Sequence, residues 1–253
     1  MDASDFPLTQ ALGVTFAVLE QVESTNAYLL DNPGIPDTVS VAVSDNQTAG
    51  RGRQGRVWSQ PPGSGIAMSV RLPVDEGTSW LSAFPLLVGG VVADVIGRET
   101  GLVASIKWPN DILLAGKKVS GILCETTDAA LIAGIGLNVR YPEDCLPTPQ
   151  ATSLHLHTEV DDSLIDRLVA GIISGLQDLV MRANRGEVAT LLADVARVIV
   201  TIGERVRVDF PDGSSREGTA TGIGPDGSLQ LVWLDGSAGV VVAGDVWHVR
   251  PVT

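Results

Sequence analysis

The chain lacks most of what a disulfide-bonded, zinc-binding or membrane protein requires. Cysteine occupies two of its 253 positions, Cys124 and Cys145, which is too few for a disulfide framework and lacks zinc-type spacing. No apolar run reaches the roughly 20 residues that span a bilayer. The N-terminal residues are partly acidic and polar, whereas a signal peptide needs a basic start and an apolar stretch. These absences predict a cytoplasmic protein with reduced thiols and no membrane partner.

Positive charge is also scarce, and it is clustered. The formal net charge is -13, and the chain has only three lysines, Lys107, Lys117 and Lys118. Because nucleic-acid affinity depends largely on phosphate neutralisation by Lys and Arg, DNA is a poor default partner. Three arginines nevertheless lie within six residues, at Arg51, Arg53 and Arg56. A bias toward Arg over Lys would explain the shortage of lysine but not this clustering.

The length and the hydrophobic content of 44% suit one large domain followed by a small one. Apolar periodicity predicts strands at residues 14–22, 39–44, 65–72, 103–107, 112–115, 118–126 and 129–139. The strand at 39–44 alternates as if one face were covered, and successive hairpins imply an antiparallel or mixed sheet. Helical spacing is found at 25–30, 78–99, 162–185 and 187–198. The Ser24 hydroxyl is expected to cap the first of these helices.

Two further features concern the division of the chain. Pro85 and the pair Gly89 and Gly90 should kink or divide the helix at 78–99. After residue 201 the sequence pattern changes to short β-prone runs separated by turn sequences, which is typical of a small β-barrel. We therefore expect one domain at residues 1–200 and a second at 201–253.

A long segment without apolar periodicity, residues 45–65, is the first candidate for a functional loop. Its residues 50–55 match G-x-G-x-x-G, but a dinucleotide fingerprint needs a helix opening at the third glycine, and Pro61 and Pro62 follow instead. The remaining alternatives are a mobile clamp for anions, built from glycines and forked guanidinium donors, or an exposed basic loop without a ligand. Trp58 is either ordinary core or a ring that covers an apolar ligand.

The second cluster of cations includes Lys107, which closes an apolar strand beside Trp108 and Pro109. Its ammonium is expected to point into a cleft, although a lone lysine is more often on the surface. Asn110 and Asp111 fit either a plain turn or a magnesium site.

Five motifs together resemble the biotin protein ligases in content, order and spacing: ESTN (23–26), GRGRQGRVW (50–58), KWPND (107–111), KVSGILCE (118–125) and GIGLNV (134–139). The resemblance implies an α+β fold, with a central mixed sheet flanked by helices as in class II aminoacyl-tRNA synthetases and lipoate ligases. It also implies a small SH3-like C-terminal domain. One departure is Gly65, where many family members have asparagine, and it puts one contact at the biotin floor in doubt.

The resemblance also implies roles for individual residues. Biotin would be bound by Ser24, Thr25, Asn26, Gln47, Gly50, Arg51, Gly52, Arg53, Trp58, Lys107 and Gly121. Within this set, hydroxyl and amide groups of Ser24, Thr25 and Gln47 suit the neutral polar ureido ring. ATP or the adenylate would be bound by Arg51, Arg53, Arg56, Trp58, Lys107, Asn110, Lys118 and Asn138. Lys107 and Arg53 are the expected catalytic residues, because fixed cations stabilise charge on the carboxyl and the phosphate.

The implied activity is ATP-dependent biotinylation of a lysine on the biotin carboxyl carrier domain of a carboxylase, with biotinyl-5'-AMP as intermediate and Mg²⁺ as cofactor. Two alternatives stay open: a lipoate or octanoate ligase of the same superfamily, and a non-catalytic biotin-responsive regulator. Only about twenty residues precede the ESTN motif, too few for a winged helix-turn-helix, which disfavours the regulator. Monomer and homodimer both remain open.

Overall fold

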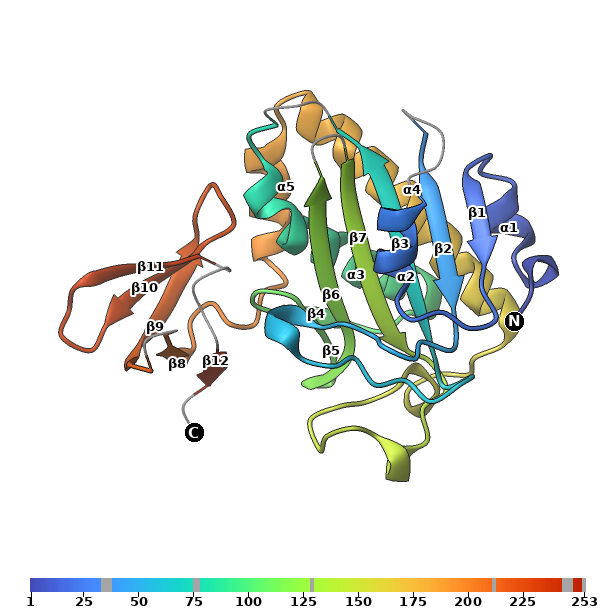
Figure 1. Ribbon diagram of the computed structural model, residues 1–253. Helices are drawn as coiled ribbons and strands as arrows, with labels where there is room; N and C mark the ends of the chain where they lie inside the picture. The colour runs from blue at the N-terminus through green and yellow to red at the C-terminus, as the bar shows by residue number, and fades with distance from the viewer. Residues whose placement is uncertain (33–37, 75–77, 128–129, 211–212, 243–247, 252–253) are drawn as a thin grey trace.

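The computed structural model describes residues 1–32, 38–74, 78–127, 130–210, 213–242 and 248–251, and within them the chain forms two separate β-sheets (Figure 1). The larger sheet has seven strands in the order β1-β2-β3-β7-β6-β5-β4. Its β1–β2 pair is parallel and the others are antiparallel. The strands are β1 (Thr15–Val18), β2 (Ser40–Ser44), β3 (Gly65–Pro73), β4 (Ala104–Lys107), β5 (Asp111–Leu114), β6 (Lys117–Thr127) and β7 (Ala130–Asn138). The predicted mixed sheet is confirmed.

Helices cover both faces of this sheet (Figure 1). The short helix α2 (Thr25–Asp31) packs on β2, β3 and β7, while the opposite face carries α3 (Phe84–Thr100) and α4 (Asp162–Asn184). The remaining α-helices are α1 (Pro7–Gln10), against α4, and α5 (Val188–Ala196), against α3. Because helices lie on both sides, all five residues of β2 are buried, so the expectation of one covered face was wrong.

The expected break in the helix at 78–99 does not occur where we placed it. A 3-10 helix (Leu81–Ala83) leads into α3, and Pro85 lies in the first turn of α3, where its missing N–H costs nothing. Gly89 and Gly90 lie inside the continuous helix. A Cβ at Gly90 would collide with Val195 of α5, so Gly90 allows close packing of the two helices rather than a kink.

The same segment bears on whether the chain could span a membrane, although Asp94, Arg98 and Glu99 interrupt its apolar run. Leu81–Thr100 is long and apolar enough to do so by length and composition. In the fold, however, Phe84, Val88 and Val92 of this stretch are fully buried in the core. Its apolar surface is therefore used against the larger sheet and its neighbouring helices.

The C-terminal part forms a five-stranded antiparallel sheet in the order β11-β10-β9-β8-β12. Its strands are β8 (Arg205–Asp209), β9 (Ser215–Ile223), β10 (Leu229–Trp233), β11 (Ala238–Val241) and β12 (His248–Pro251). Residues 243–247, which include the start of the last β-prone run, lie outside the described residues. Closure of this sheet into an SH3-like barrel and the boundary at residue 200 stay predictions.

The segment between the two sheets is paired with the larger one. Ile106 of β4 forms a parallel bridge with Ile199, through hydrogen bonds to Val198 (2.8 Å) and from Val200 (2.9 Å). Residues 198–200 therefore extend the larger sheet beyond β4 before the chain enters the C-terminal sheet.

Candidate active site

A cleft of about 330 Å³ opens on the face of the larger sheet that also carries α2. This volume is at the lower end of the range that is usual for small-molecule binding sites. The predicted residues that line it come from every one of the motifs: Ser24, Thr25, Asn26, Gln47, Arg51, Gly52, Arg53, Arg56, Trp58, Lys107, Asn110, Asp111, Lys118, Gly121 and Asn138. Arg53 and Lys107, which are 54 positions apart in the chain, thus share one cavity. Gly50 lies outside the lining, buried at the base of the arginine loop.

One end of the cleft is formed by the start of α2. Ser24 precedes the helix in extended conformation, but in the described residues its hydroxyl does not cap the first turn, contrary to our expectation. The Gln47 side chain does so instead: its Oε1 accepts from the Thr25 backbone N–H at 2.9 Å and from the Thr25 hydroxyl at 3.3 Å. A β-bridge between Val22 and Gln47 holds that side chain over the helix. This end offers uncharged hydroxyl and amide groups.

A buried network behind this end includes two residues that sequence reasoning missed. The Ser69 hydroxyl lies within hydrogen-bonding distance of both Thr25 Oγ1, at 2.7 Å, and Asn26 Oδ1, and its one proton is shared between these two oxygens. The Asn26 amide in turn donates to Glu125 Oε2 at 2.7 Å and to the Leu123 carbonyl at 3.1 Å. Both Asn26 donor groups are thereby used on the protein, which fixes its orientation beneath the cleft. The signal for Ser69 was its place on the alternate face of β3, opposite the core residues Met68 and Val70.

The floor of the cleft is made of glycines on β6 and β7. Gly121 is paired with Gly136, and Gly134 lies two residues away on the same face. The Trp58 ring lies against this floor, since a Cβ at Gly136 would run into it and one at Gly121 would lie 3.0 Å from it. The spacing of Gly134 and Gly136 within a strand was the available signal for two residues that our residue assignments omitted.

Trp58 is held from two sides. Its indole N–H donates to Gln60 Oε1 at 3.2 Å, and the Lys118 ammonium lies 5.6 Å from the ring centre. The Gln60 side chain also fills the space above Gly65, where a Cβ would lie 3.3 Å from Gln60 Cδ and 2.6 Å from the Leu137 carbonyl oxygen. A larger residue at position 65 would need these groups to move, so the departure from asparagine is matched by local packing.

The arginine loop is a hairpin rather than the entry to a helix. Trp58 N–H donates to the Gly50 carbonyl at 2.9 Å, Gly52 N–H to the Arg56 carbonyl at 2.7 Å, and the tip is a 3-10 turn (Arg53–Gly55). A Cβ at Gly50 would collide with the Trp58 carbonyl, which explains the glycine. Arg56 continues in extended conformation, so the dinucleotide interpretation is excluded.

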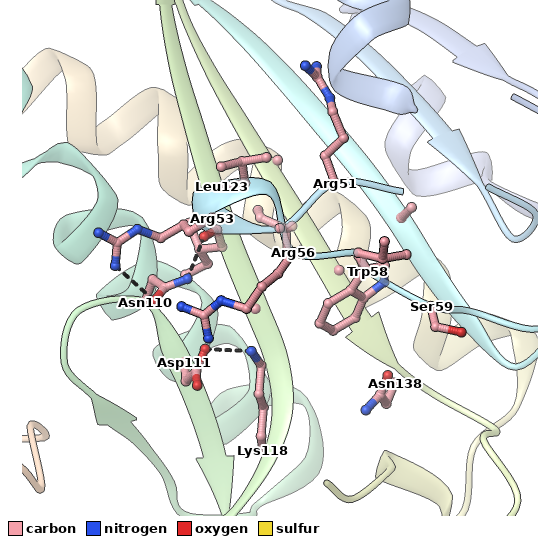
Figure 2. A pocket seen from close by; sticks show the side chains of 18 of the residues that line it. Arg51, Arg53, Arg56, Trp58, Ser59, Asn110, Asp111, Lys118, Leu123 and Asn138 are labelled. Carbon is pink, nitrogen blue, oxygen red and sulfur yellow. Dashed lines mark hydrogen bonds and ion pairs between the residues drawn. The ribbon is translucent and has the colours of Figure 1, made fainter. Parts of the chain in front are cut away.

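The three arginines of this loop point in different directions (Figure 2). Arg51 turns away from the other two and pairs with Glu125 at 3.0 Å. Arg53 lies toward Asn110, whose Oδ1 accepts from its guanidinium at 3.3 Å. Burial, and secondly the neighbouring Arg56 guanidinium, lower the pKa of Arg53 below its usual value. The guanidinium stays charged, so an anion between Arg53 and Arg56 would relieve their repulsion.

Lys107 ends β4 with its side chain half-buried in the lining of the cleft. Within the part of the chain that the structure describes, no carboxylate forms an ion pair with it. Lys118 differs, because it contacts Asp111 Oδ1 at 2.6 Å. Lys107 therefore offers a charge that is available to a ligand, and Lys118 one that is already paired. Asn138 is buried, its amide donating to the Thr152 carbonyl at 2.9 Å.

The proposed magnesium ligands do not fit a metal site built by the protein. Asn110 Oδ1 accepts from Arg53 and its amide N–H donates to the Ile122 carbonyl at 2.8 Å, while Asp111 is paired with Lys118. Among the described residues, no group of three His, Cys, Asp or Glu side chains is placed to hold a metal ion. Cys124 is equally unsuited to chemistry, because burial raises the pKa of its thiol.

Similarity to known proteins places the chain in a class of ligases that act on biotin or lipoate. Residues 18–141 match the model of the Biotin/lipoate A/B protein ligase family, and residues 201–249 match that of the Biotin protein ligase C terminal domain. The chain is 38% identical to the biotin–[acetyl-CoA-carboxylase] ligase of Mycobacterium tuberculosis over 244 residues, covering 92% of this chain and 88% of that protein. The chain belongs to the biotin protein ligase family.

Two further similarities bear on its architecture. A biotin protein ligase from Aquifex aeolicus, solved with biotin and ATP, superposes with a TM-score of 0.75 at 25% identity, covering 94% of this chain and 99% of that one. The bifunctional ligase/repressor BirA of Escherichia coli is 36% identical over 137 residues, or 52% of this chain and 43% of that protein. The similarity to BirA thus involves less than half of the bifunctional protein.

Proposed function

We propose that this chain activates biotin with ATP and transfers it to a lysine of a biotin carboxyl carrier domain. The observation that supports this best is the composition of the cleft beside α2. Uncharged donors and acceptors at Thr25 and Gln47 suit a ureido ring, and the cations Arg53 and Lys107 suit a carboxylate and phosphates. Between them, the Trp58 ring, which lies on the glycine floor, offers an apolar surface for an aliphatic chain.

The first step has to turn a carboxylate into an electrophile, since its own leaving group would be oxide. An oxygen of the biotin carboxylate attacks the α-phosphorus of ATP, the bond to the bridging oxygen breaks, and pyrophosphate leaves with the electron pair. The product is the mixed anhydride biotinyl-AMP. Two anions must approach each other in this step, so the unpaired charge of Lys107 and the guanidinium of Arg53 lower the barrier.

In the second step the neutral ε-amine of the carrier lysine attacks the acyl carbon of biotinyl-AMP. The C–O bond to phosphate breaks, AMP leaves, and the amine loses a proton to solvent as the amide forms. Lys107 stabilises the oxyanion that develops on the acyl oxygen. Because the anhydride hydrolyses when water reaches it, the hairpin that carries Arg51, Arg53 and Arg56 would protect it by covering the cleft.

Partners and organisation follow from the same proposal. The carrier is the biotin carboxyl carrier domain of a biotin-dependent carboxylase. Residues 1–200 would act as the catalytic domain and 201–253 as an SH3-like C-terminal domain. Magnesium is expected to arrive with the nucleotide phosphates rather than on protein ligands. The cytoplasmic location and the absence of DNA and membrane partners stay predictions. A gel-shift assay tests whether the chain binds DNA.

The test is to incubate the purified chain with labelled biotin, Mg-ATP and a carrier domain, and to measure biotinyl-AMP, AMP and label on the carrier. We expect label on the wild-type carrier and none on a carrier whose target lysine is replaced by arginine. Lipoate is the matched control substrate, because its apolar dithiolane has no polar atoms with which to hydrogen-bond the hydroxyl and amide groups around Thr25 and Gln47. Equal or faster transfer of lipoate would overturn the assignment to biotin.

A further inference from the structure

The two neighbours of Lys107 in the sequence, Ile106 and Trp108, both form hydrogen bonds with the segment at residues 198–201. Ile106, before it, exchanges backbone hydrogen bonds with Val198 and Val200. Trp108, after it, donates its backbone N–H to the Thr201 hydroxyl at 2.9 Å. Thr201 is itself buried, so water cannot replace this contact readily. The position of the lysine backbone is therefore set by the segment that leads into the C-terminal sheet.

The C-terminal sheet itself makes a fourth contact. The Trp108 indole is almost fully buried, and its Nε1–H donates to the Gly227 carbonyl at 3.0 Å. Gly227 lies in the turn between β9 and β10 and has a φ of +80°, a conformation that favours glycine. A Cβ there would also lie 3.0 Å from Ala83 Cα. The turn therefore packs between Trp108, on one side, and the start of α3, on the other.

Hydrogen bonds within the turn at residues 224–228 hold it in one conformation, independently of its contact with Trp108. Gly224 N–H donates to the Ser228 carbonyl at 2.8 Å, and Gly227 N–H to the Gly224 carbonyl at 3.0 Å. The Asp226 carboxylate accepts from both the N–H and the hydroxyl of Ser228. Such a side-chain bond to the backbone two residues on fixes a turn. The Gly227 carbonyl is therefore presented at a defined place.

We infer that the C-terminal part positions the active-site lysine, with Trp108 and Thr201 as positioning residues for adenylation. The inference rests on the proposed function and extends it. Lys107 faces the cleft while Ile106, its neighbour on β4, faces the core, so small movements of this strand end move the ammonium relative to the reacting atoms. A displacement of about 1 Å in such a site costs on the order of 100-fold in rate. The biotin ring, at the far end near Thr25, is not affected.

Each variant removes a single hydrogen bond, and the Trp-to-Phe changes also leave a smaller ring in a buried position, an effect that the control variant shares. Trp108→Phe removes the donor to Gly227, and Thr201→Val removes the acceptor for Trp108 N–H, while Thr201→Ser restores a hydroxyl. The matched control is Trp80→Phe, because Trp80 is also buried and also donates its indole N–H, at 3.3 Å to Asn184, but lies away from the cleft. Thermal unfolding of each variant accounts for changes in stability.

Biotinyl-AMP formation in a single turnover and the Kd for biotin are the readouts. We expect Trp108→Phe and Thr201→Val to slow adenylation on the order of 10-fold to 100-fold, with biotin affinity within about threefold of the wild type. Thr201→Ser and Trp80→Phe should retain the wild-type rate. In a Lys107→Met background, Trp108→Phe should add less than about twofold, because it acts through the lysine.

Two results would overturn the inference: the same loss from Trp80→Phe as from Trp108→Phe, or an undiminished effect of Trp108→Phe without Lys107. If Trp108→Phe does not fold, the comparison of Thr201→Val with Thr201→Ser decides alone. Failure of the proposed function is distinguishable, because the wild-type chain would then form no biotinyl-AMP.

Discussion

Replacing Lys107 by methionine tests the assignment of the unpaired charge in the cleft. Methionine retains an unbranched, apolar side chain and removes only the ammonium. At about 4 Å and an effective dielectric of about 20, a lysine and an anion attract each other by about 4 kcal/mol. Only the part gained between the bound state and the transition state accelerates the reaction. If that part lies between half and all of the attraction, the adenylation rate falls by roughly 30-fold to 1000-fold.

Lys118→Met makes the same chemical change at a lysine that already contacts Asp111 at 2.6 Å. Its charge is partly exposed and already paired, and such pairs contribute little, so we expect a loss of about fivefold or less. Biotin-dependent exchange between ATP and pyrophosphate measures adenylation, and calorimetry measures biotin affinity. If Lys107→Met weakened biotin binding as much as it slowed adenylation, Lys107 would be a binding residue. If Lys107→Met and Lys118→Met lost rate equally, the distinction between the two lysines would be wrong.

Three further predictions concern the loop, the floor and the fold. Arg53→Ala should release biotinyl-AMP about 10-fold faster, because a charge-assisted contact over the cleft is lost; unchanged retention of labelled intermediate on gel filtration would argue against a clamp. Gly134→Ala should weaken biotin binding by about fivefold or more, since its Cβ would collide with the Asn26 amide; calorimetry measures this, with Gly97→Ala, where there is space, as control. Asp166→Ala should lower the free energy of unfolding by about 3 kcal/mol in urea titrations, because three donors from Leu8 and Thr9 lose a buried acceptor; full stability would contradict this account.

The elements of the larger sheet could be predicted because each has a periodicity of its own. β3, β6 and β7 are long β-prone runs bounded by turn residues, and α4 carries its apolar residues three and four apart. The start of α3 was predicted wrongly, because proline interrupts a helix everywhere except in its first turn. At position 85 it lies within that first turn, which only the structure defines.

The candidate site could be predicted as a set of residues but not as a set of contacts. Short motifs specify which side chains meet, whereas the partner of each depends on groups far away in the sequence. Gln47 rather than Ser24 caps α2 because a β-bridge at Val22 brings the loop over the helix. Glu125 pairs with Arg51 across 74 positions. Neither contact leaves a local signal, so the division of the arginines between Glu125 and Asn110 could not be anticipated.

Residues 198–200 also shield the last strand of the larger sheet from other chains. An edge strand with free N–H and C=O groups is a template for association, and β4 would be such an edge without its bonds to Val198 and Val200. Val103, directly before β4, is 88% exposed and would add an apolar contact. A chain shortened to residue 196 should therefore aggregate through β4, whereas one that ends after Thr201 keeps this edge covered.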